Sequence, residues 1–206
     1  DSTAGGGGNG AGKELVVGLQ LEPSNLDIRA TGGVALDQIL IDNVYQGLIG
    51  LKSGTVDEFV PVLAEELPEQ SDDGLTYTFT MREGVSFASG NKLTAADVVD
   101  SLSAAEGPAS LSTALGAPVT VTSPDERTVV LELSAPNSQL LWQLANRPGL
   151  VFETAYTGDL ASTSNGTGPF ALKQWKQGDS ITFAANPEYW GEKPAVEKAT
   201  YVFRTD

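Results

Sequence analysis

The 206-residue sequence contains no cysteine and no histidine. Without cysteine the chain can form no disulfide and can offer no thiolate to a metal, although such a chain is compatible with any redox compartment. Without histidine it lacks the base of Ser-His-Asp and Cys-His catalysis and the imidazole ligand of many metal sites. We therefore expect no catalytic residue, no bound metal and no cofactor.

Positive charge and long apolar runs are also scarce. The chain has 12 lysine and arginine residues against 27 aspartate and glutamate residues, which gives a net charge of −15. This charge opposes binding to nucleic acid, so we expect no nucleic-acid partner. No apolar run approaches the roughly 18 residues that a membrane span needs. The 40% hydrophobic content that is present suffices for one large domain or two small ones.

The chain opens with DSTAGGGGNGAGK, which has six glycines and almost no apolar side chain. Such a segment cannot bury enough surface to offset the entropy of ordering, so we expect residues 1–12 to form a flexible tether. Gly5, Gly7 and Gly10 match a GxGxxG pattern. No predicted strand precedes them and no helix with an apolar face follows, so the match does not indicate a dinucleotide site.

Apolar spacing in the rest of the chain predicts a mixed α/β (α+β) fold. Residues 35–51 carry apolar side chains at helical spacing, which predicts one helix over most of that range. Residues 75–81 alternate strictly between larger side chains and threonine, which predicts a half-buried antiparallel strand. Thr94 and Asp97 form a capping-box pattern at the start of a helix predicted over 93–102. Further strands are predicted at 15–21, on both sides of Pro124 within 119–133, at 170–175 and at 180–186, and a short helix at 138–146.

Four segments together resemble one family, the extracytoplasmic solute-binding proteins that deliver peptides or nickel complexes to ABC importers (family 5). The segments are EPSNLDI (22–28), DDGLTYTFTMREGVSFASGNKLTAADVVDSL (72–102), GTGPFALKQW (166–175) and NPEYWGEKPAVEKATY (186–201). Their order and separation match as well, and the resemblance covers residues 14–206.

The resemblance implies a periplasmic-binding-protein-like II fold, in which a ligand lies between two lobes. Residues 13–44 and 163–206 are then expected to form the core of the first lobe, and residues 45–162 an inserted α+β subdomain. Because members of this family are more than twice as long, we expect the second lobe to be missing from this chain. The glycine-rich start without methionine resembles a lipoprotein whose signal peptide and acylated cysteine are absent. We therefore expect an extracytoplasmic protein, lipid-anchored at the cell membrane or periplasmic.

The function implied by the resemblance is that of a substrate-binding component of an ABC importer. It would capture oligopeptides or dipeptides outside the cytoplasmic membrane, as a monomer that meets a membrane permease. A nickel or metallophore receptor of the same fold is the nearest alternative. Two alternatives from other classes are a carboxylate-dependent hydrolase and a cell-surface adhesion or signalling module. The paired carboxylates Asp72 and Asp73 precede Gly74 and favour a solvated turn over a catalytic pair.

Two candidate ligand contacts follow from the resemblance. The loop of Thr31, Gly32, Gly33 and Val34 matches a loop that lines the cleft and pairs its backbone with the ligand, as strands pair. An ordinary glycine-rich turn is the alternative. Arg147, followed by a proline, resembles a cleft arginine of the nickel-type receptors. Its guanidinium could take a ligand carboxylate in two parallel hydrogen bonds, or it could form a surface ion pair.

Other motifs favour structural roles. Tyr189 and Trp190 lie in NPEYWGEKP, which resembles a structural buckle between a subdomain and the main sheet, so we expect core packing rather than ligand contact. The GTGP turn at 166–169 is expected near a hinge. Asn165 begins an N-x-T glycosylation pattern, which is weak when it stands alone.

Overall fold

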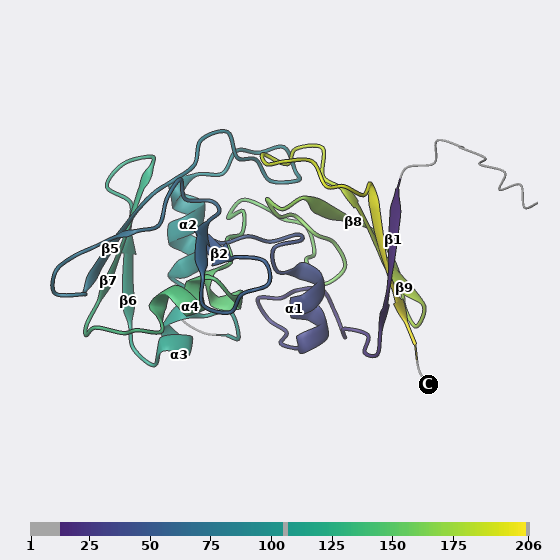
Figure 1. The fold of residues 1–206 in the computed structure, drawn as a ribbon, viewed down its shortest axis with the longest axis horizontal. Coiled ribbons are helices and arrows are strands. Elements are labelled where there is room, and N and C mark those ends of the chain that lie inside the picture. The colour runs from purple at the N-terminus through teal and green to yellow at the C-terminus, as the bar shows by residue number, and fades with distance from the viewer. Residues whose placement is uncertain (1–12, 105–106, 205–206) are drawn as a thin grey trace, which may run out of the picture.

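A computed structural model describes residues 13–104 and 107–204 of the chain. The expected tether, residues 1–12, lies outside the described residues. The described part contains ten strands, four α-helices and one 3-10 helix, and its strands form three sheets (Figure 1). None of its helices combines the length and the apolar character that a membrane crossing requires.

One four-stranded sheet has the order β1-β10-β9-β8 and contains both the start and the end of the described chain. Strand β1 runs parallel to β10, and the other pairs are antiparallel. The elements on this side are β1 (Glu14–Leu19), α1 (Val34–Leu40), β8 (Phe170–Lys176), β9 (Ser180–Ala185) and β10 (Lys198–Phe203). Leu36, Ile39 and Leu40 of α1 are buried in one hydrophobic cluster with Ile181 and Phe183 of β9, here called the α1 cluster.

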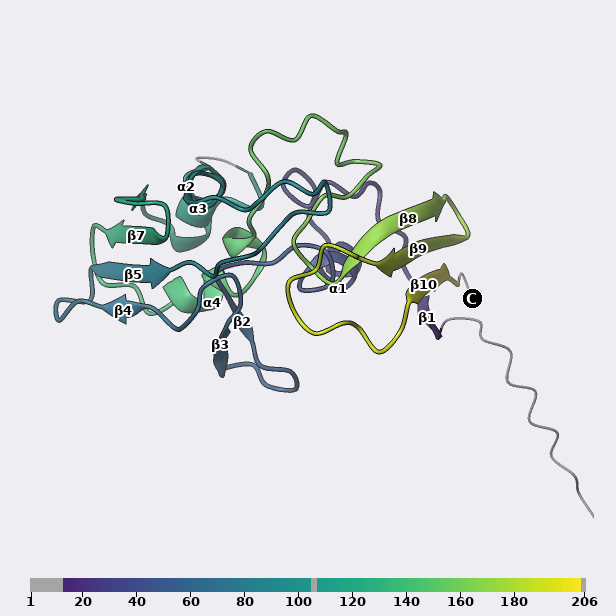
Figure 2. The same ribbon diagram turned by 90° about the horizontal axis from the view of Figure 1, so that it is seen from above.

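A second four-stranded sheet lies at the opposite end of the molecule (Figure 2). Its order is β4-β5-β7-β6, and all its pairs are antiparallel. The strands are β4 (Glu69–Gln70), β5 (Thr76–Thr80), β6 (Val119–Thr122) and β7 (Thr128–Leu133); the helices are α2 (Ala95–Leu102), α3 (Leu111–Leu115) and α4 (Leu140–Leu144). Their buried side chains form a separate hydrophobic cluster, here called the α2 cluster, which includes Phe79, Val98, Leu131 and Leu144.

The chain crosses between the two clusters in its middle portion. Leu150 and Phe152 belong to the α1 cluster, whereas Val151 between them belongs to the α2 cluster. The short hairpin of β2 (Ile49–Leu51) and β3 (Phe59–Pro61) follows another crossing. Because neighbouring residues serve different clusters, these crossing segments join the two regions closely.

Several local predictions are confirmed. Tyr77 and Phe79 of β5 are buried, as the strict alternation of that segment predicts. Thr94 and Asp97 form a complete capping box at the start of α2, in which each side chain bonds the other residue's backbone N–H. The strands around Pro124 are β6 and β7, and the helix predicted at 138–146 is the shorter α4.

The helix predicted over 35–51 is wrong in its second half. Helix α1 ends at Leu40, Ile41 is extended, and Asp42 has a left-handed backbone with φ of 64°. Val44 and Leu48 are fully buried, but in the crossing segment rather than on a helix. The apolar spacing that suggested a longer helix therefore reflects burial between two clusters, which overrides local periodicity.

The expected packing role is confirmed for Trp190, whereas Tyr189 belongs to neither cluster. Trp190 lies in the connection between β9 and β10 and packs against the α2 cluster. Its indole N–H donates to Gln46 Oε1 at 3.0 Å, and the guanidinium of Arg82 lies 4.4 Å from the ring centroid. Tyr189 is half-buried beside it, with ring centroids 5.4 Å apart. The pair thus ties the β9–β10 connection to the other region.

Candidate functional site

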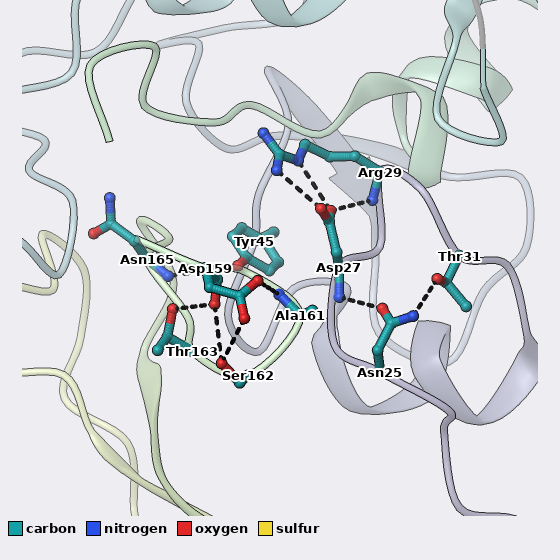
Figure 3. A network of polar contacts seen from close by, with 10 residues as sticks. All are labelled: Asn25, Asp27, Arg29, Thr31, Tyr45, Asp159, Ala161, Ser162, Thr163 and Asn165. Carbon is teal, nitrogen blue, oxygen red and sulfur yellow. Dashed lines mark hydrogen bonds and ion pairs between the residues drawn. The ribbon is translucent and has the colours of Figure 1, made fainter. Parts of the chain in front are cut away.

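The loop that leads into α1 is closed on itself by hydrogen bonds (Figure 3). Leu26 and Ile28 are buried in the α1 cluster and so attach the loop to the hydrophobic core. The Asn25 side chain donates to Thr31 Oγ1 at 2.7 Å, and the Thr31 N–H donates to the carbonyl of Asp27 at 2.9 Å. These hydrogen bonds hold residues 25–31 in one conformation and so fix the position of residues 32–34, which follow.

The predicted contact loop, residues 31–34, lies at the surface of the molecule. Gly32, Gly33 and Val34 are exposed, and Val34 keeps 70% of its surface accessible although it is apolar. Within the described residues, the backbone N–H groups of Gly32 and Gly33 donate to no hydrogen-bond acceptor. Exposed backbone donors on a fixed loop can accept an added extended chain, as the edge of a sheet does.

The structure brings Arg147 to this loop from the other region. Arg147 begins the 3-10 helix η1 (Arg147–Gly149), and its side chain is only 13% exposed. Its Nε donates to Asp37 Oδ1 at 2.8 Å, and Nη2 contacts the same oxygen. A Cβ placed on Gly32 would lie 2.8 Å from Arg147 Nη1, so the guanidinium rests against the loop backbone.

All five residues of the predicted site therefore lie at one place, and Arg147 forms the ion pair that was the alternative to ligand contact, with its side chain largely buried. Asp37 already neutralises its charge and takes two of its nitrogens. A ligand carboxylate would have to compete with that aspartate. The contact joins residues 110 positions apart and holds α1, the loop and η1 together.

A second arginine, Arg29, lies just before the loop and was missed by sequence reasoning. Its Nε and Nη2 donate to the two carboxylate oxygens of Asp27, each at 2.9 Å (Figure 3). These hydrogen bonds lower the pKa of Asp27 and raise the pKa of Arg29. The Arg29 guanidinium lies 5.6 Å from the ring centroid of Phe152, and Nη1 has no partner among the described residues. The side chain remains 49% exposed.

Arg29 borders a cavity of about 240 Å³. The other walls come from helix α2 and from the segment after η1; they include Asp100, Ser101, Phe152, Thr154 and Tyr156. The Ser101 hydroxyl accepts a hydrogen bond from the Phe152 N–H at 2.9 Å, which holds this aromatic residue in place at the cavity wall. The cavity thus combines one cation, carboxylates and apolar surface. Its signal in the sequence is an arginine directly before a glycine-rich loop in a chain with few cations.

A buried polar network closes the region behind this cavity. The Glu153 carboxylate accepts hydrogen bonds from Ser89, Asn91 and Asn165. Asn165 is only 3% exposed, so the glycosylation pattern it begins has no accessible amide in the folded chain. Within residues 13–104 and 107–204, no three acidic side chains are grouped to hold a metal ion.

Comparison with known proteins identifies the family. Residues 58–206, well over half of the chain, match the family described as "Bacterial extracellular solute-binding proteins, family 5 Middle". The chain belongs to this family of solute-binding proteins.

The relatives share the fold and are much longer. Protein XP55 of Streptomyces lividans is 34% identical, over 97% of this chain and 37% of its own length. The glutathione-binding protein GsiB of Escherichia coli O1:K1 / APEC is 32% identical, over 91% and 37%. The structure of MoaA in complex with mannopinic acid, from A. tumefaciens R10, superposes with a TM-score of 0.84 at 28% identity, over 95% and 42%. The mixed α/β, periplasmic-binding-protein-like II fold is therefore confirmed, and the chain spans about two fifths of these relatives.

Proposed function

We propose that this chain is the N-terminal part of the substrate-binding component of an ABC importer that captures oligopeptides or dipeptides outside the cytoplasmic membrane. Membership of a bacterial extracellular solute-binding family supports the class of function. The relative GsiB is named for a small peptide, glutathione, which supports a peptide ligand. The proposal assigns no catalytic residue, metal or cofactor to the chain.

The single observation that carries the proposal is the free backbone of the contact loop. Gly32 and Gly33 offer exposed N–H groups that no other part of the described chain uses. Backbone pairing gives affinity without reading side chains, which suits a receptor for varied peptides. We therefore assign ligand contact to Thr31, Gly32, Gly33 and Val34.

Arg147 belongs to the same proposed wall, behind the loop. It supports Gly32 and is paired with Asp37, so its first role is to position the loop. Its Nη1 side faces the loop backbone, where a bound ligand would lie close to it. The cavity at Arg29 extends the wall and suits a ligand group that combines charge with apolar surface.

The proposed organisation follows the same reasoning. Residues 13–44 and 163–206 form the first-lobe core, and residues 45–162 form the inserted subdomain. The separate α1 and α2 clusters support two regions, although Tyr45, Leu150, Phe152 and Leu160 of the 45–162 range pack in the α1 cluster. A second lobe in the complete receptor would close over the wall, and the closed form would meet a membrane permease. We propose a monomer that is periplasmic or lipid-anchored at the outer face of the membrane.

The test is native mass spectrometry of the complete receptor, purified gently so that bound ligand is retained. The proposal predicts a co-purified peptide, identified by fragmentation after its release. A nickel–metallophore complex in its place would favour the alternative receptor of the same fold. A released product that accumulates with turnover would instead indicate a hydrolase.

The binding wall itself is tested by calorimetry with the peptide so identified. Lys52→Gln is the control. Lys52 forms an exposed ion pair with Glu58, and neither residue belongs to the contact loop 31–34. The control should bind as the wild type does. Gly32→Ala should bind more weakly, since the added Cβ displaces either the loop or Arg147.

A further inference from the structure

A second hollow lies away from the contact loop. It is bounded by the β2–β3 hairpin and by the connection between β9 and β10, which lie along the same side of the molecule in Figure 2. Its volume is about 420 Å³, and its lining includes Asp42, Gln46, Ser53, Val62, Tyr189 and Trp190. None of these residues belongs to the proposed peptide wall.

Asp42 is the charged group of this hollow. Its φ of 64° makes it the one non-glycine residue with positive φ among those described. The turn is held by a hydrogen bond from its N–H to the Tyr45 carbonyl at 2.9 Å. Aspartate tolerates this conformation, but strained positions of this kind often accompany functional sites. The backbone thus directs a carboxylate to a place that a regular helix would not reach.

The Asp42 carboxylate has no hydrogen bond or ion pair within residues 13–104 and 107–204. A Cβ on Gly50 would lie 3.6 Å from Asp42 Oδ1 and 3.1 Å from Val62, so the glycine leaves room beside the carboxylate. The surrounding chain raises the pKa of Asp42 by displacing water from it. Asp42 is nevertheless an exposed residue and lines the hollow.

Two aromatic residues line the same hollow. Tyr189 and Trp190 have centroids 5.4 Å apart and planes inclined by 54°. Gln46 holds the Trp190 N–H, and the Arg82 guanidinium lies 4.4 Å from the centroid of that ring, so this face is already taken by a cation and Trp190 can offer a ligand only apolar contact. The Tyr189 hydroxyl makes no hydrogen bond in the described part of the chain. Aromatic faces beside an unpaired carboxylate attract an ammonium group.

We propose that this hollow binds a small alkylamine through its ammonium group, with Asp42 as the ion-pair partner and the two rings along the alkyl stem. A divalent metal ion is less suited, because Ca²⁺ takes about 6–8 oxygen ligands and the hollow offers one carboxylate. An anion would meet that carboxylate in a chain of net charge −15. This inference is independent of the peptide wall, since the two sites share no lining residue.

The experiment is an NMR titration of this chain with n-butylamine, which is an ammonium ion at neutral pH. The amides of Asp42 and Gln46 and the indole N–H of Trp190 should shift together and saturate. The neutral isostere n-butanol should bind at least about tenfold more weakly, which is about 1.4 kcal/mol. Asp42→Asn should weaken n-butylamine binding to a similar extent, and it keeps the turn because asparagine also tolerates positive φ.

The matched control is Asp57→Asn, which removes an exposed charge from the loop of the same hairpin. It should leave the affinity for n-butylamine unchanged. Three results would overturn the proposal: equal binding of n-butanol and n-butylamine, equal losses in the two variants, or no saturable shift at these three probes. The peptide-binding proposal would survive each of them, because it concerns other residues.

Discussion

Arg147 and Arg29 approach the same loop from opposite ends and differ in how much of each side chain the fold uses. Arg147 is 13% exposed and pairs with Asp37, a residue 110 positions away. Arg29 is 49% exposed, pairs with Asp27, two positions away, and borders a cavity. One arginine therefore joins distant segments, and the other is oriented by its neighbour and stays accessible.

The two arginines differ mainly in where their carboxylate partners lie in the sequence. We use this difference, rather than distance from a cleft, to separate a structural role from a binding role. A long-range pair whose arginine is largely buried is costly to break, because removal of the arginine takes away both its packing and the partner of Asp37, which is itself 36% exposed. A local, exposed pair contributes little to stability but fixes the direction of the guanidinium. On this basis we propose that Arg147 supports the wall and that Arg29 contacts the bound solute.

The largest expected effect is on stability when the long-range pair is broken. Arg147→Ala should lower the free energy of unfolding of this chain by about 1 to 3 kcal/mol, because Asp37 loses its partner and the loop loses its support. Urea denaturation followed by far-UV circular dichroism measures it. Arg29→Ala is the matched control and should cost less than about 1 kcal/mol. Equal losses would remove the distinction between the two arginines.

The second effect is on peptide binding, for which Arg29 should matter more than Arg147. In the complete receptor, Arg29→Gln should weaken peptide binding by about tenfold, since it removes a charge-assisted hydrogen bond worth about 1.4 kcal/mol. Calorimetry on the purified variant provides the dissociation constant. An unchanged constant would show that the cavity at Arg29 takes no part in ligand binding.

A smaller effect tests the contact between Gly32 and Arg147. Gly32→Ala should cost about 1 kcal/mol or less, because the Cβ meets the flexible end of the arginine side chain rather than backbone. In the Arg147→Ala background the same substitution should cost less, since the steric contact is gone. A double-mutant cycle of unfolding free energies measures this coupling. Strict additivity would mean that the two residues do not act on each other.

The smallest effect is a pH dependence of opposite sign at two aspartates. The pKa of Asp27 is lowered by Arg29, so its contribution to stability is present above the ordinary aspartate pKa and is lost as the pH falls through the lowered value. The pKa of Asp42 is raised by desolvation, so its ionisation costs stability above that raised value. At neutral pH, Asp27→Asn should therefore destabilise the chain and Asp42→Asn should stabilise it.

Both differences should shrink as the pH is lowered and the wild-type carboxylates become protonated. Thermal unfolding of the wild type and of both variants between neutral and acidic pH follows the change. Differences of the same sign at neutral pH would contradict the assigned environments.

The parts of the fold that were predictable are those fixed by neighbouring residues. The alternation of β5 and the capping box of Thr94 and Asp97 each depend on side chains within one element. Helix α1 was predicted too long, because Val44 and Leu48 are buried by tertiary packing that mimics helical spacing. Helix α3 was missed, since the Gly-Pro pair before its cap, Ser110, indicated only the end of the preceding helix.

In the candidate site, too, the parts set by neighbouring residues could be predicted and the long-range contacts could not. The loop 31–34 could be found from its glycines and its resemblance to the family's loop. The partner of Arg147 could not, because Asp37 is distant in sequence and one of many acidic residues. The cavity at Arg29 is assembled from segments distant in sequence, and the arginine before the glycine-rich loop signals only one of its walls.

In the proposed function, the backbone of residues 31–34, supported by Arg147, pairs with the bound peptide. Hydrogen–deuterium exchange of the complete receptor, with and without its peptide, tests this at the amides concerned. We expect the Gly32 and Gly33 amides to exchange at least about tenfold more slowly when the peptide is bound, because they gain acceptors that they lack within the described residues of the free chain. Exchange at these two amides that is unchanged at saturating peptide would contradict the claim.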